Sequence, residues 1–252
     1  LHKFCQKEDI ITVNVNYRLD ALGFLPFSEF TADASSSYPG AVGNYGLYDK
    51  ITALKWIQNN IAHFGGDPRN VTIFGESSGA KSVELLSTTP LTCDVSGMPS
   101  LFHKVIGQSG AYDIISDPDD KHGMMSASSW ENQVNPVSVD PFNVAGLTNR
   151  KLWINYLGAK DANDVDLSGD ALVTFMQGLS AEIFIADDRP LQPGPVYDSN
   201  FTIDSNIFAM QDTSGVFNQN MDRPTLLGSN SNEQGVYSLF NRFGSDTATI
   251  MS

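Results

Sequence analysis

Residues 71–86 contain the feature that most restricts the fold of this chain. A short apolar run, residues 71–74, is joined to a helix-compatible run, residues 80–86, through the sequence Gly75-Glu76-Ser77-Ser78-Gly79. The pattern Gly-x-Ser-x-Gly permits a sharp strand-to-helix turn, because glycine has no Cβ to clash at a tight bend. The sequence therefore predicts a strand, a tight turn and a helix that hold the Ser77 hydroxyl in a strained, exposed position.

Ser77 is accordingly a candidate nucleophile, and the backbone N–H of Ser78 is a candidate donor to a developing oxyanion. The five-residue pattern alone also fits an ordinary loop, since Gly and Ser are common loop residues. The apolar run before the turn and the helical run after it provide the setting that the catalytic interpretation requires.

The remaining segments alternate between strand-like and helix-like patterns. We expect strands at residues 10–17, 104–107 and 225–228, helices at 47–64, 142–157 and 167–179, a long surface loop at 18–43, a polar stretch without a clear period at 113–139, and an extended region at 187–201. Such alternation predicts an α/β fold with a mostly parallel or mixed sheet and helices on its faces.

The helix predicted at residues 47–64 has one apolar stripe. Its members recur at steps of three and four residues: Leu47, Ile51, Leu54, Ile57 and Ile61. Trp56 and this stripe are expected to belong to the core rather than to a ligand-binding box. The sequence Gly65-Gly66-Asp67-Pro68 predicts the end of the helix.

Composition excludes several classes of function. The 252 residues include 15 basic and 29 acidic side chains, a formal net charge of −14. This balance argues against nucleic-acid binding, which depends on Lys and Arg to neutralise phosphates. No stretch approaches the roughly 18 apolar residues that a membrane span needs. A hydrophobic content of 41% is ordinary for one large globular domain.

Cysteines and glycosylation triplets give weaker indications. Cys5 and Cys93 are compatible with one disulfide, with pairing to segments outside this chain, or with two buried thiols. Asn70 and Asn200 each begin an Asn-x-Thr triplet. We interpret Asn70 as a turn residue before a strand and Asn200 as the better candidate for an N-glycan. Residues 1–8 lack the pattern of a signal peptide, so this end reads as the middle of a longer polypeptide.

An ordered series of motifs resembles the type-B carboxylesterases and cholinesterases. The motifs are Val13-Asn14-Val15-Asn16-Tyr17-Arg18-Leu19, Gly23-Phe24-Leu25, Gly43-Asn44-Tyr45-Gly46-Leu47-Tyr48-Asp49-Lys50, Ala53-Leu54-Lys55-Trp56, Asn60-Ile61, Phe64-Gly65-Gly66-Asp67-Pro68 and Val71-Thr72-Ile73-Phe74-Gly75-Glu76-Ser77. The resemblance is dense over residues 10–110, thin over 113–189, and returns at 195–198 and 224–240. It implies an α/β-hydrolase fold with a mostly parallel central sheet flanked by helices, incomplete in this chain.

The resemblance also implies roles for Glu233 and Glu76, while the role of Ser109 follows from its place at the end of a predicted strand. The family's triad acid is a glutamate in a Gly-x-x-x-x-Glu-Gly segment, and Gly228 places Glu233 in that register, although Gln234 stands where the family has the glycine. Glu76 occupies the position of a glutamate at the base of the family's active-site gorge. Ser109, at the end of a predicted strand, is expected to donate or accept hydrogen bonds near the site rather than to catalyse.

A serine triad also needs an imidazole, and the chain has four: His2, His63, His103 and His122. None has a catalytic setting, and the resemblance puts the catalytic histidine beyond Ser252. It likewise puts the first oxyanion glycines before Leu1. We therefore expect residues 1–252 to be part of a single α/β-hydrolase domain that lacks its N-terminal and C-terminal portions.

These expectations favour hydrolysis of a small carboxylic ester through a serine acyl-enzyme, with no metal or cofactor, by a protein that is secreted or extracellular. The rest of the parent polypeptide is then a required partner, and this chain alone is expected to be inactive. An inactive adhesion or scaffold domain, as in neuroligin-like and thyroglobulin-like proteins, is the alternative, because one fold hosts both functions. A third interpretation, a complete small esterase that uses His63 or His122, leaves the sheet without its early strands.

Overall fold

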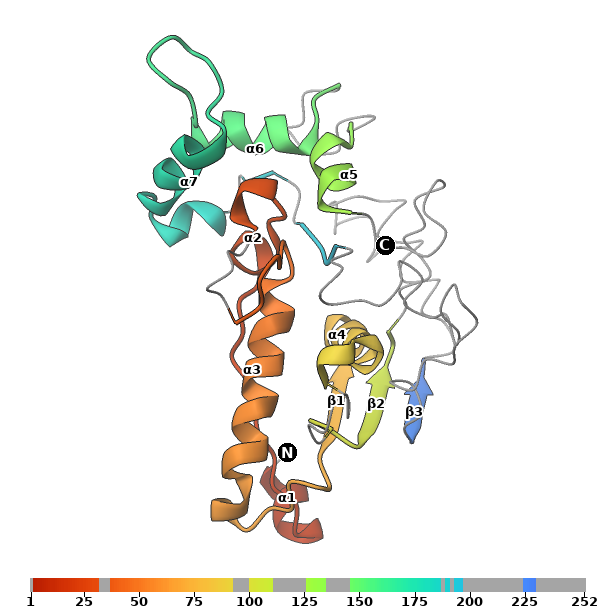
Figure 1. Ribbon diagram of the computed structural model, residues 1–252. Helices are drawn as coiled ribbons and strands as arrows, with labels where there is room; N and C mark the ends of the chain where they lie inside the picture. The colour runs from red at the N-terminus through yellow and green to blue at the C-terminus, as the bar shows by residue number, and fades with distance from the viewer. Residues whose placement is uncertain are drawn as a thin grey trace.

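The computed structural model describes residues 2–31, 37–92, 100–110, 126–134, 146–186, 189–190, 193–196 and 224–229, with the backbone alone given for residues 2–4 (Figure 1). Within these residues, a small parallel sheet and two groups of helices surround two separate apolar clusters. No helix in this part of the chain has the length and apolar character needed to cross a membrane.

The sheet consists of β1 (Thr72–Glu76), β2 (Lys104–Gln108) and β3 (Thr225–Gly228), all parallel and in that spatial order. All three arrows in Figure 1 point the same way. The three strands predicted at residues 71–74, 104–107 and 225–228 are therefore confirmed. The parallel arrangement brings the carboxyl ends of the strands to one edge of the sheet, where α/β proteins place functional groups.

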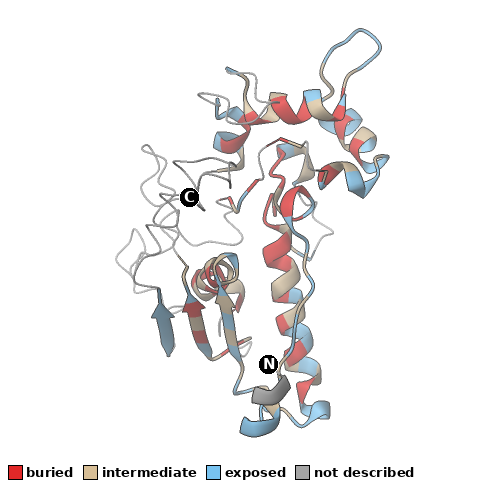
Figure 2. Cartoon of the chain, turned by 180° about the vertical axis from the view of Figure 1, so that it is seen from behind, coloured by how far each residue is buried: buried red, intermediate tan, exposed pale blue. Residues whose placement is uncertain are grey.

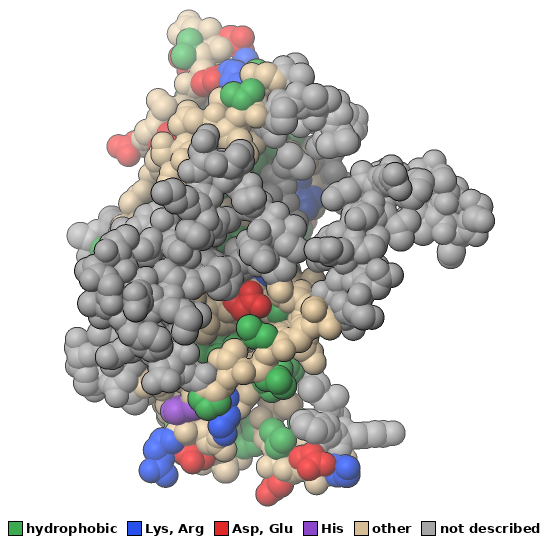
Figure 3. Space-filling model, turned by 90° about the vertical axis from the view of Figure 1, so that its right-hand side faces the viewer, with side chains coloured by type: hydrophobic (Ala, Val, Ile, Leu, Met, Phe, Trp, Pro, Cys, Tyr) green, Lys and Arg blue, Asp and Glu red, His purple; other side chains and the backbone are tan. Residues whose placement is uncertain are grey.

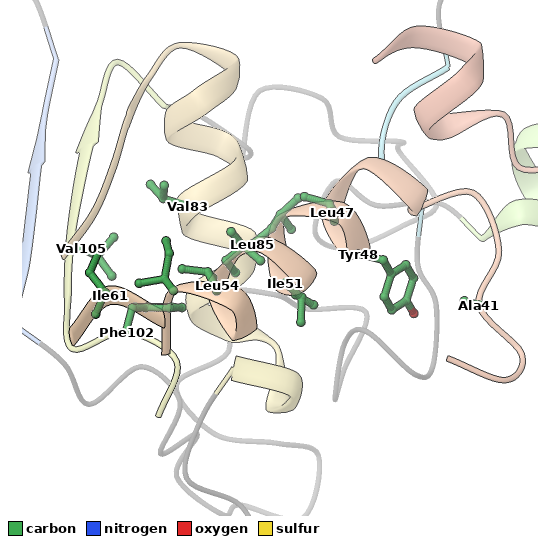
Figure 4. Packing of buried hydrophobic residues seen from close by; sticks show 12 residues of the cluster. Ala41, Leu47, Tyr48, Ile51, Leu54, Ile61, Val83, Leu85, Phe102 and Val105 are labelled. Atoms are coloured by element: carbon green, nitrogen blue, oxygen red, sulfur yellow. The ribbon is translucent and has the colours of Figure 1, made fainter. Parts of the chain in front are cut away.

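Helices α3 (Tyr45–Asn60) and α4 (Ser78–Thr88) form the first cluster together with β2. A short 3₁₀ turn, η2 (Ile61–Phe64), continues α3, and Gly65 ends it with a φ of 86°. All five members of the predicted apolar stripe are buried. Figure 4 shows Ile51 and Leu54 of α3 close to Leu85 of α4. These contacts hold α3 and α4 together beside the sheet.

The second cluster joins four short helices that lie above the upper end of α3 in Figure 1. They are α2 (Asp20–Phe24), α5 (Ala127–Asn132), α6 (Asn149–Leu157) and α7 (Gly169–Gln177), accompanied by η1 (Ser28–Phe30) and η4 (Ala181–Phe184). Trp153 and Phe27 are its largest fully buried side chains. The remaining elements are α1 (His2–Glu8) and η3 (Pro90–Thr92).

Two predictions near the N-terminus are wrong. Residues 10–17 form no strand, and Ile10, Ile11 and Val13 are 44%, 43% and 40% exposed. The apolar run has no neighbouring strand among the described residues, so its backbone groups have no ladder to join. The predicted surface loop at residues 18–43 instead contains α2 and contributes buried residues such as Phe27 to the second cluster. The red segments there are visible in Figure 2.

The helices of the second cluster differ from their predicted bounds. The helix predicted at residues 142–157 begins at Asn149, because the Thr148 side chain accepts a hydrogen bond from the Lys151 N–H and caps the first turn. The helix predicted at 167–179 is observed as α7. Helix α5 lies in a stretch where we expected no regular structure, and it buries Trp130.

Trp56 is not a core residue. Its side chain is 48% exposed and packs against the ring of Phe64, with ring centroids 6.0 Å apart. The residue lies beside the buried stripe of α3, on the solvent side. It borders an open groove of about 570 Å³ lined by Asn16, Tyr17, Arg18, Asp49, Thr52, Ala53 and Trp56.

Candidate active site

Ser77 lies in the predicted strand-to-helix turn, between β1 and α4. Its backbone has φ 54° and ψ −117°, a conformation that costs a non-glycine residue about 1–3 kcal/mol. The side chain is half-buried and forms no capping hydrogen bond with α4. The turn is therefore strained, as the sequence predicted, and the hydroxyl is not used to stabilise the helix that follows.

Gly75 is the glycine that makes this turn possible. A Cβ at this position would lie 2.3 Å from the carbonyl carbon and 2.4 Å from the carbonyl oxygen of Gly79. No side chain can occupy that space without moving the backbone. A Cβ at Gly79 would meet nothing within 4 Å among the described atoms. The two glycines of the pattern therefore differ, and only Gly75 is required by close packing in the described region.

Backbone hydrogen bonds fix the turn on both sides. The N–H of Ser77 donates to the carbonyl of Gln108 at 2.9 Å, and the carbonyl of Ser77 accepts from the N–H of Lys81 at 3.0 Å. The first bond ties the turn to the end of β2, and the second ties it to the first turn of α4. Ser77 is thus held by the neighbouring strand as well as by its own helix.

Ser78 is the first residue of α4 and is exposed. The first N–H groups of a helix have no acceptor within the helix, and the helix dipole makes this end attractive to negative charge. Both properties suit a donor to an oxyanion. The geometry is therefore compatible with the predicted role of the Ser78 N–H.

The ends of the three strands are aligned at this edge. Glu76 pairs in register with Gln108, and Gln108 pairs with Gly228. The N–H of Ser109 donates to the carbonyl of Gly228 at 2.6 Å, and Ser109 has a φ of 58°. The structure thus brings Glu76, Ser109 and the end of β3 to the same edge as Ser77.

Of the two predicted carboxylates, Glu76 and Glu233, only Glu76 lies within the described residues. Glu76 is exposed at the carboxyl end of β1, next to Ser77. Glu233 lies outside the described residues, as do Cys93, His122 and Asn200. The chain leaves the sheet at Gly228, five positions before Glu233, at the edge that carries Ser77. Cys5 is a free thiol whose sulfur lies 3.1 Å from the Thr12 Oγ1.

Neither described histidine side chain lies near Ser77. The Nδ1 of His103 accepts from the N–H of Val71 at 3.3 Å, at the start of the parallel strands, while Ser77 follows their end. The five residues of β1 lie between these two levels, which are therefore roughly 20 Å apart along the strand. His63 is exposed in η2, just before the loop that leads into β1. On the face drawn in Figure 3, the purple of histidine among the described residues appears only at the lower end, where the strands begin.

Lys50 is a residue of this region that the sequence patterns did not single out. Its Nζ lies 3.0 Å from the Oγ of Ser82 in α4 and 3.5 Å from the ring centroid of Tyr17. Burial lowers the pKa of Lys50 to about 8, although the charge of Asp49 opposes that shift. One signal was available in the sequence, because position 50 is three residues after Leu47 and four before Leu54 in the buried stripe.

The described residues hold no group of three or more His, Cys, Asp or Glu side chains arranged to bind a metal ion. The polar groups at the strand ends are instead a serine hydroxyl, a carboxylate and backbone N–H groups. This set is suited to acyl transfer, in which a hydroxyl attacks a carbonyl carbon and N–H groups stabilise the oxyanion.

Comparison with known proteins identifies relatives over most of the chain. The model of the carboxylesterase family matches residues 1–249. Mouse neuroligin-2 is 32% identical over 229 residues, which cover 89% of this chain and 22% of neuroligin-2. Rabbit liver carboxylesterase 1 is 47% identical over 103 residues, and the fumonisin B1 esterase of Sphingopyxis macrogoltabida is 44% identical over 103 residues; each match covers 41% of this chain.

The matched parts of these relatives are small fractions of their length. The matches cover 16% of the rabbit enzyme and 17% of the fumonisin esterase. Among solved structures, a carboxylesterase of Geobacillus stearothermophilus superposes with a TM-score of 0.64 at 25% identity, covering 97% of this chain and 44% of that enzyme. The chain therefore belongs to the carboxylesterase family and has the α/β-hydrolase fold.

Proposed function

We propose that this chain is the central part of a serine carboxylesterase in which Ser77 is the nucleophile. The observation that carries the proposal is the conformation of Ser77, strained at φ 54° and held by Gln108 at the carboxyl ends of parallel strands. Strain of this kind persists only where the surrounding structure imposes it, and it concentrates at functional sites.

In the proposed reaction, the Ser77 oxygen attacks the carbonyl carbon of an ester and its proton passes to an imidazole. The N–H of Ser78 donates to the oxygen that becomes negative. The imidazolium then returns the proton to the leaving alcohol, and an acyl-enzyme remains. Water, deprotonated by the same imidazole, attacks the acyl carbon and releases the acid and the free serine. No metal or cofactor takes part.

Glu233 is proposed to orient that imidazole. Support comes from β3, which ends at Gly228 beside Ser109 and so directs the following residues along the edge that carries Ser77. The imidazole itself is proposed to come from a segment outside these 252 residues, since neither His63 nor His103 is placed to serve. Glu76, adjacent to Ser77, is proposed to add negative charge to the site, and Ser109 to contribute hydrogen bonds.

The parent polypeptide is proposed to supply the rest of a single domain that includes residues 1–252. The superposition supports this, because 97% of the chain matches only 44% of the Geobacillus enzyme. The chain by itself is then expected not to turn over esters. We further propose extracellular residence and an N-glycan on Asn200, on the basis of the triplet Asn200-Phe201-Thr202 and the likeness to neuroligin-2 and rabbit liver carboxylesterase 1.

A second candidate function is adhesion without catalysis. It is favoured by the match to neuroligin-2, which extends over 89% of this chain, whereas the match to rabbit carboxylesterase covers 41%. The shorter match has the higher identity, 47% against 32% for neuroligin-2. We favour the enzyme because a binding domain has no need of a strained serine turn.

Turnover of p-nitrophenyl acetate by the full-length protein tests this choice. We expect hydrolysis that Ser77→Ala abolishes and that Glu233→Gln lowers by several powers of ten. Ser87→Ala is the matched control, because Ser87 lies on the same helix and donates to the Glu84 carbonyl. A folded full-length protein without turnover would favour the adhesion function over the enzyme, and turnover that survives Ser77→Ala would overturn the assignment of Ser77 as the nucleophile.

A further inference from the structure

We propose that Lys50 is a positioning residue for the serine turn and acts through Ser82. The proposal rests on the proposed esterase function and adds a residue to it from the neighbouring helix. Lys50 belongs to α3, while Ser77 and Ser82 bracket the first turn of α4. The link between the two helices consists of two successive hydrogen bonds.

The first bond joins the helices. The Nζ of Lys50 lies 3.0 Å from the Oγ of Ser82 and donates to it, since an ammonium group has no lone pair to accept with. Ser82 Oγ then donates to the carbonyl of Ser78 at 2.9 Å. Because the hydroxyl has one proton, the bond from Lys50 fixes the direction in which Ser82 donates. Lys50 therefore orients Ser82 toward Ser78.

The lysine is held in place by aromatic rings. Its Nζ lies 3.5 Å from the ring centroid of Tyr17 and 5.9 Å from that of Phe24. Tyr17 is in turn fixed by the next residue, Arg18, whose Nε and Nη2 each donate to Asp49 at 2.8 Å. Asp49 precedes Lys50 in α3, so the Arg18–Asp49 ion pair holds Tyr17 beside the ammonium group of Lys50. A cation against a ring in a water-poor site gains more than one at the surface.

This series of contacts ends at Ser78, whose N–H is proposed to stabilise the oxyanion. The carbonyl of Ser78 is held by Ser82, which restrains the backbone of the residue whose N–H is the proposed oxyanion donor. A donor of this kind contributes only when it points at the position that the oxyanion occupies. Loss of Lys50 is therefore expected to lower kcat more than it changes KM, since the oxyanion forms only in the transition state.

A double-mutant cycle in the full-length protein tests the coupling. We expect Lys50→Met and Ser82→Ala each to lower kcat about tenfold with little change in KM, in line with the loss of one hydrogen bond. The double variant should resemble either single variant, because both remove the same link. Ser82→Thr keeps the hydroxyl and should retain most of the activity.

Lys55→Met is the matched control. Lys55 also lies on α3 and also contacts an aromatic residue, with its Nζ 4.9 Å from the Tyr38 ring centroid and 3.0 Å from the Tyr38 hydroxyl, but Tyr38 does not belong to α4. Its variant should keep the wild-type kcat. Equal effects of Lys50→Met and Lys55→Met, a change in KM alone, or multiplied effects in the double variant would overturn the proposal.

Hydrogen exchange separates this proposal from the proposed function. Peptides covering residues 75–82 should exchange faster in Lys50→Met and in Ser82→Ala than in Lys55→Met, whether or not the protein is an esterase. If Ser77→Ala leaves turnover intact, the assignment of Ser77 as the nucleophile fails, while the exchange measurement still decides the role of Lys50. Unchanged exchange in Lys50→Met contradicts the positioning role even in an active enzyme.

Discussion

The backbone N–H of Ser77 donates to the carbonyl of Gln108 at 2.9 Å, so the turn that carries the candidate nucleophile is attached to the adjacent strand. A strained residue at the end of one strand is thereby supported by the end of another. The support explains how a φ of 54° at a serine is maintained without a capping bond from its own side chain.

Gly75→Ala is expected to disrupt this turn, whereas Gly79→Ala is not. The alanine methyl at position 75 would lie 2.3 Å from the Gly79 carbonyl carbon, so strand and helix must separate. At position 79 the space is open, and alanine favours a helix over glycine by roughly 0.5–1 kcal/mol. Thermal unfolding of both variants measures the difference. Similar melting temperatures for the two would contradict the close packing at Gly75.

Lys50→Met is expected to alter how stability depends on pH. Because burial lowers the pKa of Lys50 to about 8, the unfolded chain binds more protons than the folded chain between pH 8 and the ordinary lysine value of 10.5. This group therefore raises the free energy of unfolding as pH increases through that window. Below pH 8 the lysine is charged in both states, so the full cost of burying its charge lowers the free energy of unfolding.

Urea unfolding between pH 7 and 10.5 measures this effect. The wild-type protein should gain stability relative to Lys50→Met as pH rises, and the Lys55→Met variant should track the wild type. Parallel curves for wild type and Lys50→Met would show that the lysine titrates in the folded state as it does in the unfolded chain.

Arg150→Met is expected to destabilise the second cluster, and less so at acidic pH. Arg150 bonds to Glu29 and, at 3.0 Å, to Glu131, both of which are largely buried. Burial opposes ionisation of Glu29, but hydrogen bonds and charge from Arg150 outweigh it and hold the pKa of Glu29 below its ordinary value of 4.5. Removing the arginine leaves carboxylates unpaired, which is costly in a buried site.

The sign of the pH effect follows from the lowered pKa. The stabilisation is present above the unfolded value near 4.5 and is lost as pH falls through the folded value. Melting temperatures of wild type and Arg150→Met should therefore differ most near pH 7 and converge toward pH 3. Lys151→Met, on the same helix with its partner Asp166 at the surface, is the control and should change stability little. A constant difference across pH would contradict the account.

His63→Ala and His103→Ala are expected to leave ester turnover of the full-length protein within about twofold of wild type, because both side chains lie at the far end of the strands from Ser77. His103→Ala removes the acceptor of the Val71 N–H and should lower the melting temperature slightly. Loss of turnover in folded His63→Ala would revive the interpretation of the chain as a complete small esterase, and loss in folded His103→Ala would contradict its placement away from the site.

Local patterns predicted most of the sheet and its nearest helices. The apolar runs of β1, β2 and β3 and the stripe of α3 are properties of neighbouring residues, and the glycines around Ser77 predicted the turn. The run at residues 10–17 has strand composition, but a strand also needs a partner, and none is described beside it. Trp56 was misassigned because it adjoins the stripe without belonging to it.

Long-range contacts account for the rest. Helix α5 has too few residues to show a period, and Trp130 is buried within a cluster that includes Phe27, about a hundred positions earlier. Lys50 acquires its setting from Ser82, 32 residues away, and from Tyr17. Such contacts depend on the complete fold, and the local pattern reveals only that Lys50 lies between Leu47 and Leu54 of the buried stripe.

Trapping of the full-length protein with an organophosphorus reagent, followed by mass spectrometry of the labelled peptide, tests the central claim most directly. These reagents react where a base activates the serine and oxyanion donors stabilise the adduct. We predict a single covalent label on Ser77, absent in Ser77→Ala, strongly slowed in Glu233→Gln and retained in Ser87→Ala. A correctly folded protein that takes no label, or takes it on another serine, would contradict the assignment of Ser77 as the nucleophile.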